Sequence, residues 1–247
     1  MLDGGAMFGV VPKSIWQKTN PADNNNMVKI AARCLLVEDI DRLILIDTGM
    51  GNKQSEKFFG YYYRWGEDSL VSSLKKHGFH ADDVTDVLLT HLHFDHCGGA
   101  VRRNSIGDLV TSFKNASHWV HKGQWDWAKN PNIREKASFL TENILPIESS
   151  GQLKFIQNHG PCLKIAEIGL DALVFDGHTE KQMIPKIKYK GREIVYAADL
   201  IPTAGHIPVP YIMGYDAVSY THLTLPTNRE VKISVVAGSL KKRGGGG

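Results

Sequence analysis

The first half of this chain contains short apolar runs with polar turns between them. A stretch with helical spacing of its apolar residues precedes the last of these runs. The runs at residues 31–37 and 43–46, with acidic residues between them, predict a β-hairpin. Residues 67–77 place apolar side chains on one helical face and stop at Gly78, which predicts a helix ahead of the buried strand 87–89. Strands that alternate with helices in this way favour a mixed α/β fold.

The second half of the chain repeats the pattern, with helices that lead into strands. We expect a short strand at 117–120, helices at 122–128 and 133–143, strands at 153–156 and 170–175, and a hairpin of 183–189 with 193–197. Strands followed by helices, twice over, fit a four-layer αβ/βα sandwich. With 247 residues, 42% of them apolar, the chain is long enough for one sizeable domain, which we place at residues 1–216.

A cluster of three imidazoles and one carboxylate follows the buried strand 87–89. The run THLHFDHCGG places His91, His93, Asp95 and His96 within six residues. At the end of an apolar strand, each imidazole needs a hydrogen-bond partner and the carboxylate needs a charge partner. One or two divalent metal ions satisfy all four, because His nitrogens and Asp oxygens are ligands for zinc and its neighbours. A solvated histidine-rich loop is the alternative, but the strand before it and the glycines after it favour a metal-binding loop.

The spacing of this cluster resembles the H-x-H-x-D-H signature of the metallo-β-lactamase-fold hydrolases. Three other segments fit the order of that family: the strand end LILIDTG at 43–49, the loop DGHT at 176–179 and the strand end VYAAD at 195–199. The stretch 199–216, with its IPT and GH motifs, resembles the branch that holds acyl-homoserine lactonases and methyl-parathion-hydrolase-like enzymes. The resemblance covers residues 2–216 and implies the sandwich fold named above.

The resemblance implies a centre of two divalent ions, Zn²⁺ by preference. Carried over by position, the ligands are His91, His93 and His178 for the first ion, Asp95 and His96 for the second, and Asp199 as a bridge between them. Asp199 would also hold the metal spacing during catalysis, and Asp95 could receive a proton. Asp47 would lie behind the ligands and orient their loop. His178 and Asp199 each follow an apolar strand, which is where open sheets collect their sites.

Three further residues are candidates for contacting a substrate. Phe58 and Tyr61 belong to the dense aromatic run FFGYYYRW at 58–65. This run could wall an apolar pocket beside the metals, or it could be a segment packed beneath a helix. His206 resembles a branch-specific histidine near the pocket.

The implied chemistry is hydrolysis of an ester or lactone by a hydroxide held between two metal ions. Metal binding lowers the pKa of water from about 15.7 to around 7. The choice of an acyl-homoserine-lactone-like substrate rests on resemblance to the branch alone. Organophosphate or thioester hydrolysis is the alternative within the same chemistry. A di-iron redox protein with a flavin-binding partner and an inactive fragment are two further alternatives.

Residues 217–247 do not fit the domain. The segment VSYTHLTLPT at 218–227 resembles translated sequencing-adapter DNA, and a basic stretch with four terminal glycines follows. We expect a non-native, disordered tail, and a domain that is truncated at both ends and poorly active. The final metal-binding histidine of the family would then be missing, unless His222 supplies it.

The net charge and the lengths of the apolar stretches bear on which partners the protein could bind. The net charge of +3 comes from the tail, because residues 217–247 hold five basic residues and one acidic residue, which leaves −1 for the rest. The apparent basicity is therefore no argument for nucleic acid or an anionic membrane as a partner, and we expect neither. No stretch approaches 18 uninterrupted apolar residues. We therefore expect a small-molecule substrate and a cytoplasmic location. The sequence does not decide whether a leader peptide preceded Met1 or whether the protein forms a homo-oligomer.

Overall fold

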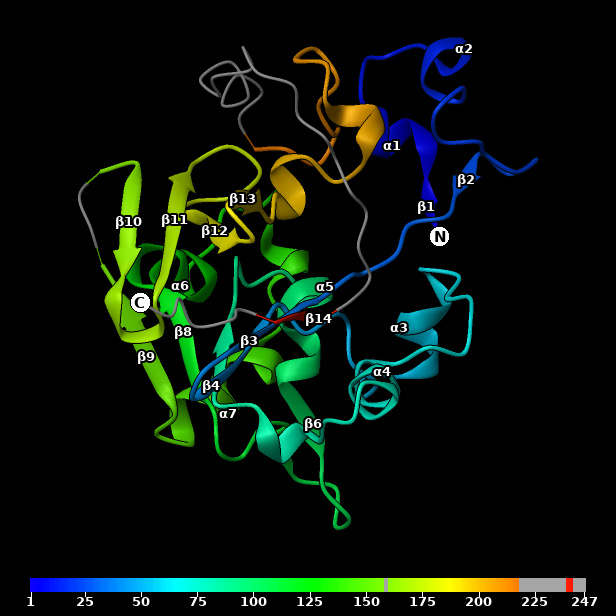
Figure 1. Cartoon of the computed structure of the whole chain (residues 1–247). Helices are drawn as coiled ribbons and strands as arrows, with labels where there is room; N and C mark the ends of the chain where they lie inside the picture. The colour runs from blue at the N-terminus through cyan, green and yellow to red at the C-terminus, as the bar shows by residue number, and fades with distance from the viewer. Residues whose placement is uncertain (158–159, 218–238, 242–247) are drawn as a thin grey trace.

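The computed structural model describes residues 1–157, 160–217 and 239–241 of the chain (Figure 1). Two β-sheets pack against each other, and α-helices cover the outer face of the larger one. This order of helix layer, sheet and second sheet forms three layers of the predicted αβ/βα sandwich. The predicted mixed α/β class is confirmed.

The larger sheet has six strands in the order β14-β3-β4-β5-β8-β9. In chain order they are β3 (Leu35–Asp39), β4 (Arg42–Ile46), β5 (Asp86–Leu88), β8 (Ser117–His121), β9 (Leu153–Ile156) and β14 (Ser239–Lys241). β3 and β4 form the predicted hairpin, whereas β4, β5, β8 and β9 run parallel. Four of the five residues of β4 are buried, because this strand lies between the helices and the second sheet.

The smaller sheet is an antiparallel meander in the order β10-β11-β12-β13. Its strands are β10 (Cys162–Ile165), β11 (Leu170–Phe175), β12 (Gln182–Tyr189) and β13 (Arg192–Val195). β10 alternates exposed and buried residues, so one face of it turns inward. That face packs on the larger sheet through a shared core of buried aliphatic side chains, among them Ile44, Leu88, Ile165 and Ile187.

Helices cover the other face of the larger sheet. They are α4 (Leu70–Lys76), α5 (Phe94–Cys97), α6 (Lys122–Lys129) and α7 (Thr141–Ser149), and the short helix α3 (Glu56–Gly60) lies to the side near α4 (Figure 1). The predicted helices near 67–77 and 122–128 are present. The helix predicted at 133–143 is displaced to 141–149, because Asn132 accepts a hydrogen bond from the backbone of Glu135 at 2.9 Å and fixes a turn there.

A small N-terminal layer packs beside this frame. It consists of β1 (Leu2–Asp3), α1 (Gly4–Phe8), α2 (Lys13–Trp16) and β2 (Met27–Val28). Its apolar side chains share a cluster with Met213, and the backbone of Gly214 donates to the carbonyl of Ala6 at 2.8 Å. The segment after Asp199 is thereby held beside the start of the chain, as Figure 1 shows near α1. A separate hairpin, β6 (Val101–Arg103) with β7 (Leu109–Thr111), occupies a stretch for which we predicted no strand.

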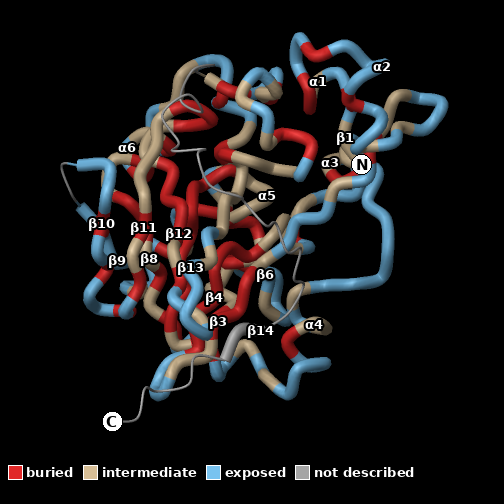
Figure 2. Tube along the Cα trace, turned by 45° about the horizontal axis from the view of Figure 1, so that its top comes forward, coloured by how far each residue is buried: buried red, intermediate tan, exposed pale blue. Residues whose placement is uncertain are grey.

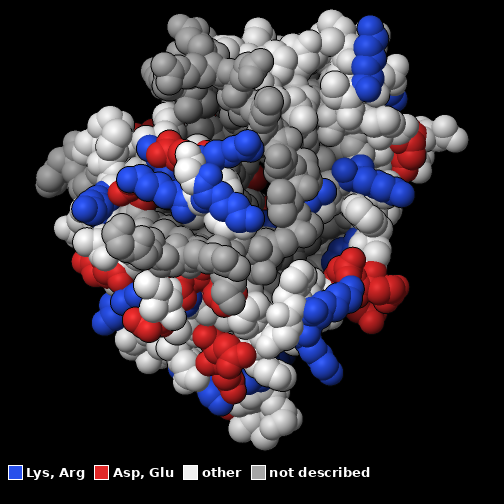
Figure 3. Space-filling model, viewed as in Figure 1, with Lys and Arg blue, Asp and Glu red and all other residues white. Residues whose placement is uncertain are grey.

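Burial follows the two sheets. Figure 2 shows buried residues concentrated in β4, β8 and β12 and exposed residues around the rim. On the face in Figure 3, basic and acidic side chains lie among one another. The ion pairs of the protein include Lys186 with Glu193 at 3.0 Å and Lys181 with Asp176 at 2.6 Å.

The longest α-helix among the described residues has nine residues, and none of the helices in that part of the chain is long and apolar enough to cross a bilayer. The tail prediction for 217–247 falls almost wholly outside the described residues, and so does His222. Both stay predictions.

Candidate metal centre

The loop after β5 is fastened to the loop after β4 by close backbone contacts. Thr48 donates its backbone N–H and its hydroxyl to the carbonyl of His96, at 2.7 and 2.9 Å. A Cβ on Gly99 would overlap the carbonyl of Thr48, and a Cβ on Gly98 would overlap the carbonyl of Met50. Only glycine allows the two loops to approach so closely, as the sequence led us to expect. The approach holds the histidine loop at the carboxyl ends of the parallel strands.

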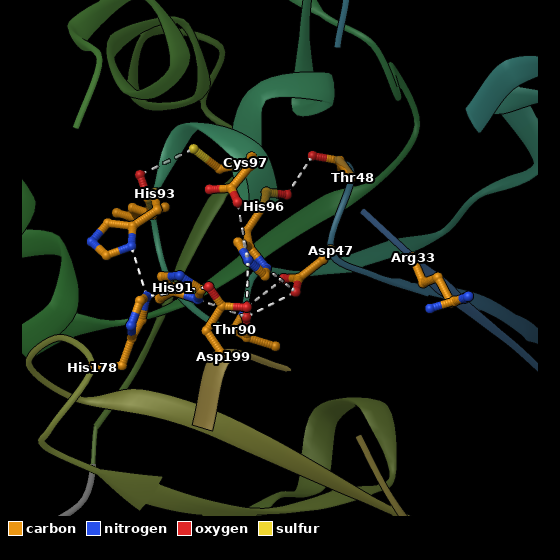
Figure 4. A network of polar contacts seen from close by, with 12 residues as sticks. Arg33, Asp47, Thr48, Thr90, His91, His93, His96, Cys97, His178 and Asp199 are labelled. Carbon is orange, nitrogen blue, oxygen red and sulfur yellow. Dashed lines mark hydrogen bonds and ion pairs between the residues drawn. The ribbon is translucent and has the colours of Figure 1, made fainter. Parts of the chain in front are cut away.

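Two imidazoles of this loop meet a third that comes from a distant part of the chain. His91, His93 and His178 each offer a ligand atom, and these atoms lie within 4.8 Å of one another. Nδ1 of His93 lies 3.0 Å from Nε2 of His178, and all three side chains are buried. Figure 4 shows His178 approaching from the second sheet while the other two project from the loop. The structure therefore brings the three residues predicted for the first ion together.

Asp199 connects this group to a second one. His91, His96 and Asp199 also offer ligand atoms within 4.8 Å of one another. Oδ1 of Asp199 lies 3.1 Å from Nε2 of His96, and Oδ2 lies 3.3 Å from Nε2 of His178. Asp95 lies near the same imidazole, with Oδ2 3.8 Å from Nε2 of His96. The two oxygens of one carboxylate thus face two different groups of imidazoles.

The backbone before Asp199 is strained. Ala198 adopts φ 44°, in the left-handed region that a Cβ disfavours. Such strain persists only where the surrounding structure over-determines the position, and it clusters at functional sites. Here the conformation accompanies the turn that leads from β13 into the 3₁₀ segment Ala198–Leu200, where the Asp199 carboxylate meets the imidazoles.

Asp47 lies behind the imidazoles of the loop. Its carboxylate accepts from the backbone of Thr90 at 2.8 Å, from the Thr90 hydroxyl at 2.9 Å and from Nδ1 of His96 at 2.8 Å. Because the Thr90 hydroxyl gives its only proton to Asp47, it must accept from Nδ1–H of His91, 3.1 Å away. This chain of bonds leaves Nε2 of His91 as the atom with a free lone pair.

Two residues that contact this cluster from outside, Asp216 and Tyr196, were not predicted from the sequence. Asp216 places Oδ1 3.0 Å from Nδ1 of His178, and both residues are buried. The Tyr196 hydroxyl donates to the carbonyl of Arg33 and lies 3.4 Å from Oδ2 of Asp47. No local pattern marks either one, because their role depends on which side chain the fold places opposite them.

The imidazoles of the cluster differ in the direction in which their pKa is shifted. Burial and the neighbouring imidazoles lower the pKa of His91 and His93 well below its usual value. Burial opposes the charge on His96 too, but the carboxylates of Asp199 and Asp95 raise its pKa well above the usual value. Burial raises the pKa of Asp95. A divalent ion binds neutral imidazole and ionised carboxylate, so at His96 it would replace a proton.

The donor set fits a divalent metal. The Nε2 atoms of His91 and His93 are buried and have no hydrogen-bond partner among the described residues. Unpaired buried nitrogens are rare and costly, and an ion would satisfy them. Imidazole nitrogens with carboxylate oxygens are ligands that zinc and related ions accept. These candidate groups support the use of a divalent metal.

The residues predicted to contact a substrate fall in different places. Phe58 packs edge-on against Phe94 of the metal loop, with ring centroids 5.3 Å apart. Tyr61 is 66% exposed, and it is Tyr62 whose ring lies 4.9 Å from Phe94. The aromatic run thus reaches the loop through Phe58, which we named, and through Tyr62, the neighbour of Tyr61.

His206 is placed in the N-terminal layer. It is 1% exposed, its Nε2 lies 2.8 Å from the carbonyl of Met7, and its Nδ1 lies 2.8 Å from the Thr203 hydroxyl. The ring also stacks on Phe8. With these bonds, His206 holds the segment after Asp199 against α1, and its described contacts lie in that layer rather than in the cluster.

Known proteins resemble both the sequence and the fold. The profile of the Metallo-beta-lactamase superfamily matches residues 30–131. An N-acyl homoserine lactonase of Bacillus cereus is 24% identical over 185 residues, which cover 67% of this chain and 72% of that protein. One from Bacillus sp. is 36% identical over 123 residues, 46% of this chain and 43% of its own length. Lactonases of Bacillus thuringiensis match at 34% identity over a third of their length. This chain therefore spans less than half of several curated relatives that it matches.

Two solved structures extend the likeness to the whole fold. A probable metal-dependent hydrolase from Staphylococcus aureus superposes with a TM-score of 0.80 at 29% identity, over 90% of this chain and 77% of that one. AidC, a dizinc quorum-quenching lactonase in complex with a product, N-hexnoyl-L-homoserine, has a TM-score of 0.58 at 25% identity. That superposition covers 76% of this chain and 63% of AidC.

Proposed function

Because this chain carries a hydrolase domain of the metallo-β-lactamase superfamily, we propose that it hydrolyses a lactone or a related ester at a centre of two Zn²⁺ ions. The proposed substrate class is an acyl-homoserine lactone. The names of the curated relatives and the dizinc lactonase neighbour support this choice. At 24–25% identity, the substrate has to be identified by assay.

The position of Asp199 carries the proposal of two ions. Its oxygens lie 3.1 Å from Nε2 of His96 and 3.3 Å from Nε2 of His178, so one carboxylate can serve two neighbouring ions. We assign His91, His93 and His178 to the first ion, Asp95 and His96 to the second, and Asp199 to both. Asp47 orients the loop from behind through Thr90 and His96.

When bound, the ions would supply a hydroxide nucleophile near neutral pH and polarise the attacked carbonyl. The side chains of this chain contribute proton handling and binding. Asp95 keeps 34% of its side chain exposed and has a raised pKa, which suits it to receive a proton and return it to a leaving alkoxide. Phe58, Tyr62 and Phe94 present aromatic surface beside Asp95, which suits an apolar acyl group.

A substrate panel tests the proposed reaction. The chain, loaded with Zn²⁺, is offered acyl-homoserine lactones of different lengths, aryl esters, thioesters and phosphotriesters at equal concentration. We expect lactone turnover to exceed the others, and to be lost when Asp199 is replaced by alanine. Turnover of phosphotriesters or thioesters without lactones would overturn the substrate class while keeping the metal chemistry.

Metal analysis tests the proposed centre separately. We expect close to two zinc ions per chain after reconstitution. Iron with visible absorption would instead support a redox protein, and zinc at one ion per chain with poor turnover would support an inactive fragment.

A further inference from the structure

Gln124 is a buried amide that bonds to two loops at once. It lies on α6 with 0% of its surface exposed. Its Oε1 accepts from the backbone N–H of Leu92 at 3.2 Å. Its Nε2 donates to the hydroxyl of Thr179 at 3.2 Å and to the carbonyl of Glu180. The oxygen of the amide therefore bonds to one loop, and its nitrogen bonds to the other.

These partners are the chain neighbours of the three clustered imidazoles. Leu92 separates His91 from His93, and Thr179 follows His178. The first loop leaves the parallel sheet after β5, whereas the second joins β11 to β12 in the antiparallel sheet. One side chain on a third element thus spans the gap between the loops that carry the first ion's proposed ligands.

A second buried residue sets the direction of the bonds. The Thr179 hydroxyl gives its only proton to Oε2 of Glu135, 2.9 Å away, so it must accept from the Gln124 amide. The Trp127 ring N–H donates to the same Glu135 oxygen at 2.8 Å, and Glu135 is 3% exposed. A fully satisfied buried network of this kind is rigid and holds its members in one arrangement.

We propose that Gln124 is a positioning residue that sets His178 relative to His91 and His93 before a metal ion arrives. The inference rests on the proposed metal centre. Gln124 acts through the backbone and the Thr179 hydroxyl, since its hydrogen bonds to the described residues reach no imidazole. Its loss leaves the ligands present but lets the two loops shift relative to each other.

Gln124→Met tests this, because methionine keeps the length of the side chain and removes both polar ends. We expect zinc affinity, measured by chelator competition, to fall by about 10- to 100-fold, the range for outer partners of metal ligands. The visible spectrum of the Co²⁺ form should also change, because it reports ligand geometry directly.

Gln152→Met is the matched control. Gln152 also ties segments together, accepting from the Thr111 hydroxyl at 2.6 Å and donating to the carbonyls of Phe113 and Ala116. Those segments hold none of the proposed ligands. We expect this variant to lose thermal stability and to keep the zinc affinity and Co²⁺ spectrum of the parent chain.

A pair of substitutions at Thr179 covers the case in which Gln124→Met does not fold. Thr179→Ser keeps the hydroxyl and should bind zinc as the parent does, whereas Thr179→Val removes it and should bind more weakly. Parent-like affinity and spectrum in both Gln124→Met and Thr179→Val would overturn the inference and leave the proposed function intact. Failure of the parent chain to bind divalent metal would overturn both.

Discussion

The two sides of the histidine cluster are built in contrasting ways. One loop of six residues supplies His91, His93, Asp95 and His96 from the larger sheet. The smaller sheet supplies His178 and Asp199 singly, from two turns more than twenty residues apart in the chain. The first group is close together because it is close in sequence. The second group reaches the cluster only because the two sheets pack face to face through a shared apolar core.

The supports differ in the same way. The loop of the larger sheet is held by nearby backbone, through Thr48, Asp47 and the glycines that follow His96. The smaller sheet's His178 is held by Asp216, which lies 38 residues further along the chain. The histidine cluster between the two sheets thus depends on local sequence on one side and on tertiary contacts on the other.

Asp199→Ala should have the largest effect. It removes the one carboxylate among the described residues that faces both groups of imidazoles, so we expect turnover to fall by at least ~100-fold, beyond the range for outer residues. Zinc content per chain should fall with it. Glu167, an exposed carboxylate of the same half, provides the control substitution to alanine. Retention of two zinc ions with full activity would refute the bridging role.

Asp47→Ala and Asp216→Ala compare the outer supports of the two sides. We expect each to weaken zinc binding by about 10- to 100-fold, because each carboxylate orients one imidazole. Asp47→Ala should also destabilise the metal-free protein, since it leaves the buried N–H of Thr90 unpaired. Chelator competition and denaturant unfolding measure the two effects. If Asp216→Ala has no effect on affinity, the smaller sheet does not need its distant support.

Gly99→Ala tests the backbone contact of the larger sheet's loop. The added Cβ would overlap the carbonyl of Thr48, a backbone atom that cannot rotate away. We expect the metal-free protein to lose about 1–3 kcal/mol of stability. Gly60 ends α3, and a Cβ there meets nothing within 4 Å, so Gly60→Ala should be neutral or stabilise by up to about 1 kcal/mol. Equal unfolding midpoints for the two variants would contradict the prediction.

Tyr196→Phe should have the smallest effect. Its hydroxyl, next to the smaller sheet, bonds to the Arg33 carbonyl and reaches Asp47 at 3.4 Å on the other side. We expect a loss of about 1 kcal/mol, the usual net value of one hydrogen bond. Tyr189→Phe, at a ring packed against the same core, serves as the control. A loss of several kcal/mol would show that the two sides are coupled mainly through this hydroxyl.

Periodicity located most elements because their apolar faces are regular. The hairpin of β3 and β4 and the helix α6 lie close to the predicted ranges. The helix predicted at 133–143 is wrong, since apolar spacing alone cannot detect the turn that Asn132 forms with the backbone of Glu135. The β6–β7 hairpin was missed because each of its strands has three residues, too few to show an alternation of buried and exposed positions.

The sequence by itself determined the chemistry of the early loop, since ligand types at fixed spacing lie together whatever the remaining fold does. It also located the strands β11 and β13, which precede His178 and Asp199 in the chain. Only the tertiary structure decided that these two face the loop, that Tyr62 rather than Tyr61 reaches it, and that His206 lies in the N-terminal layer. It also decided the positions of Asp216 and Gln124. The physical reason is that a hydrogen bond between distant segments depends on how sheets and helices pack, and no local pattern of residues records that packing.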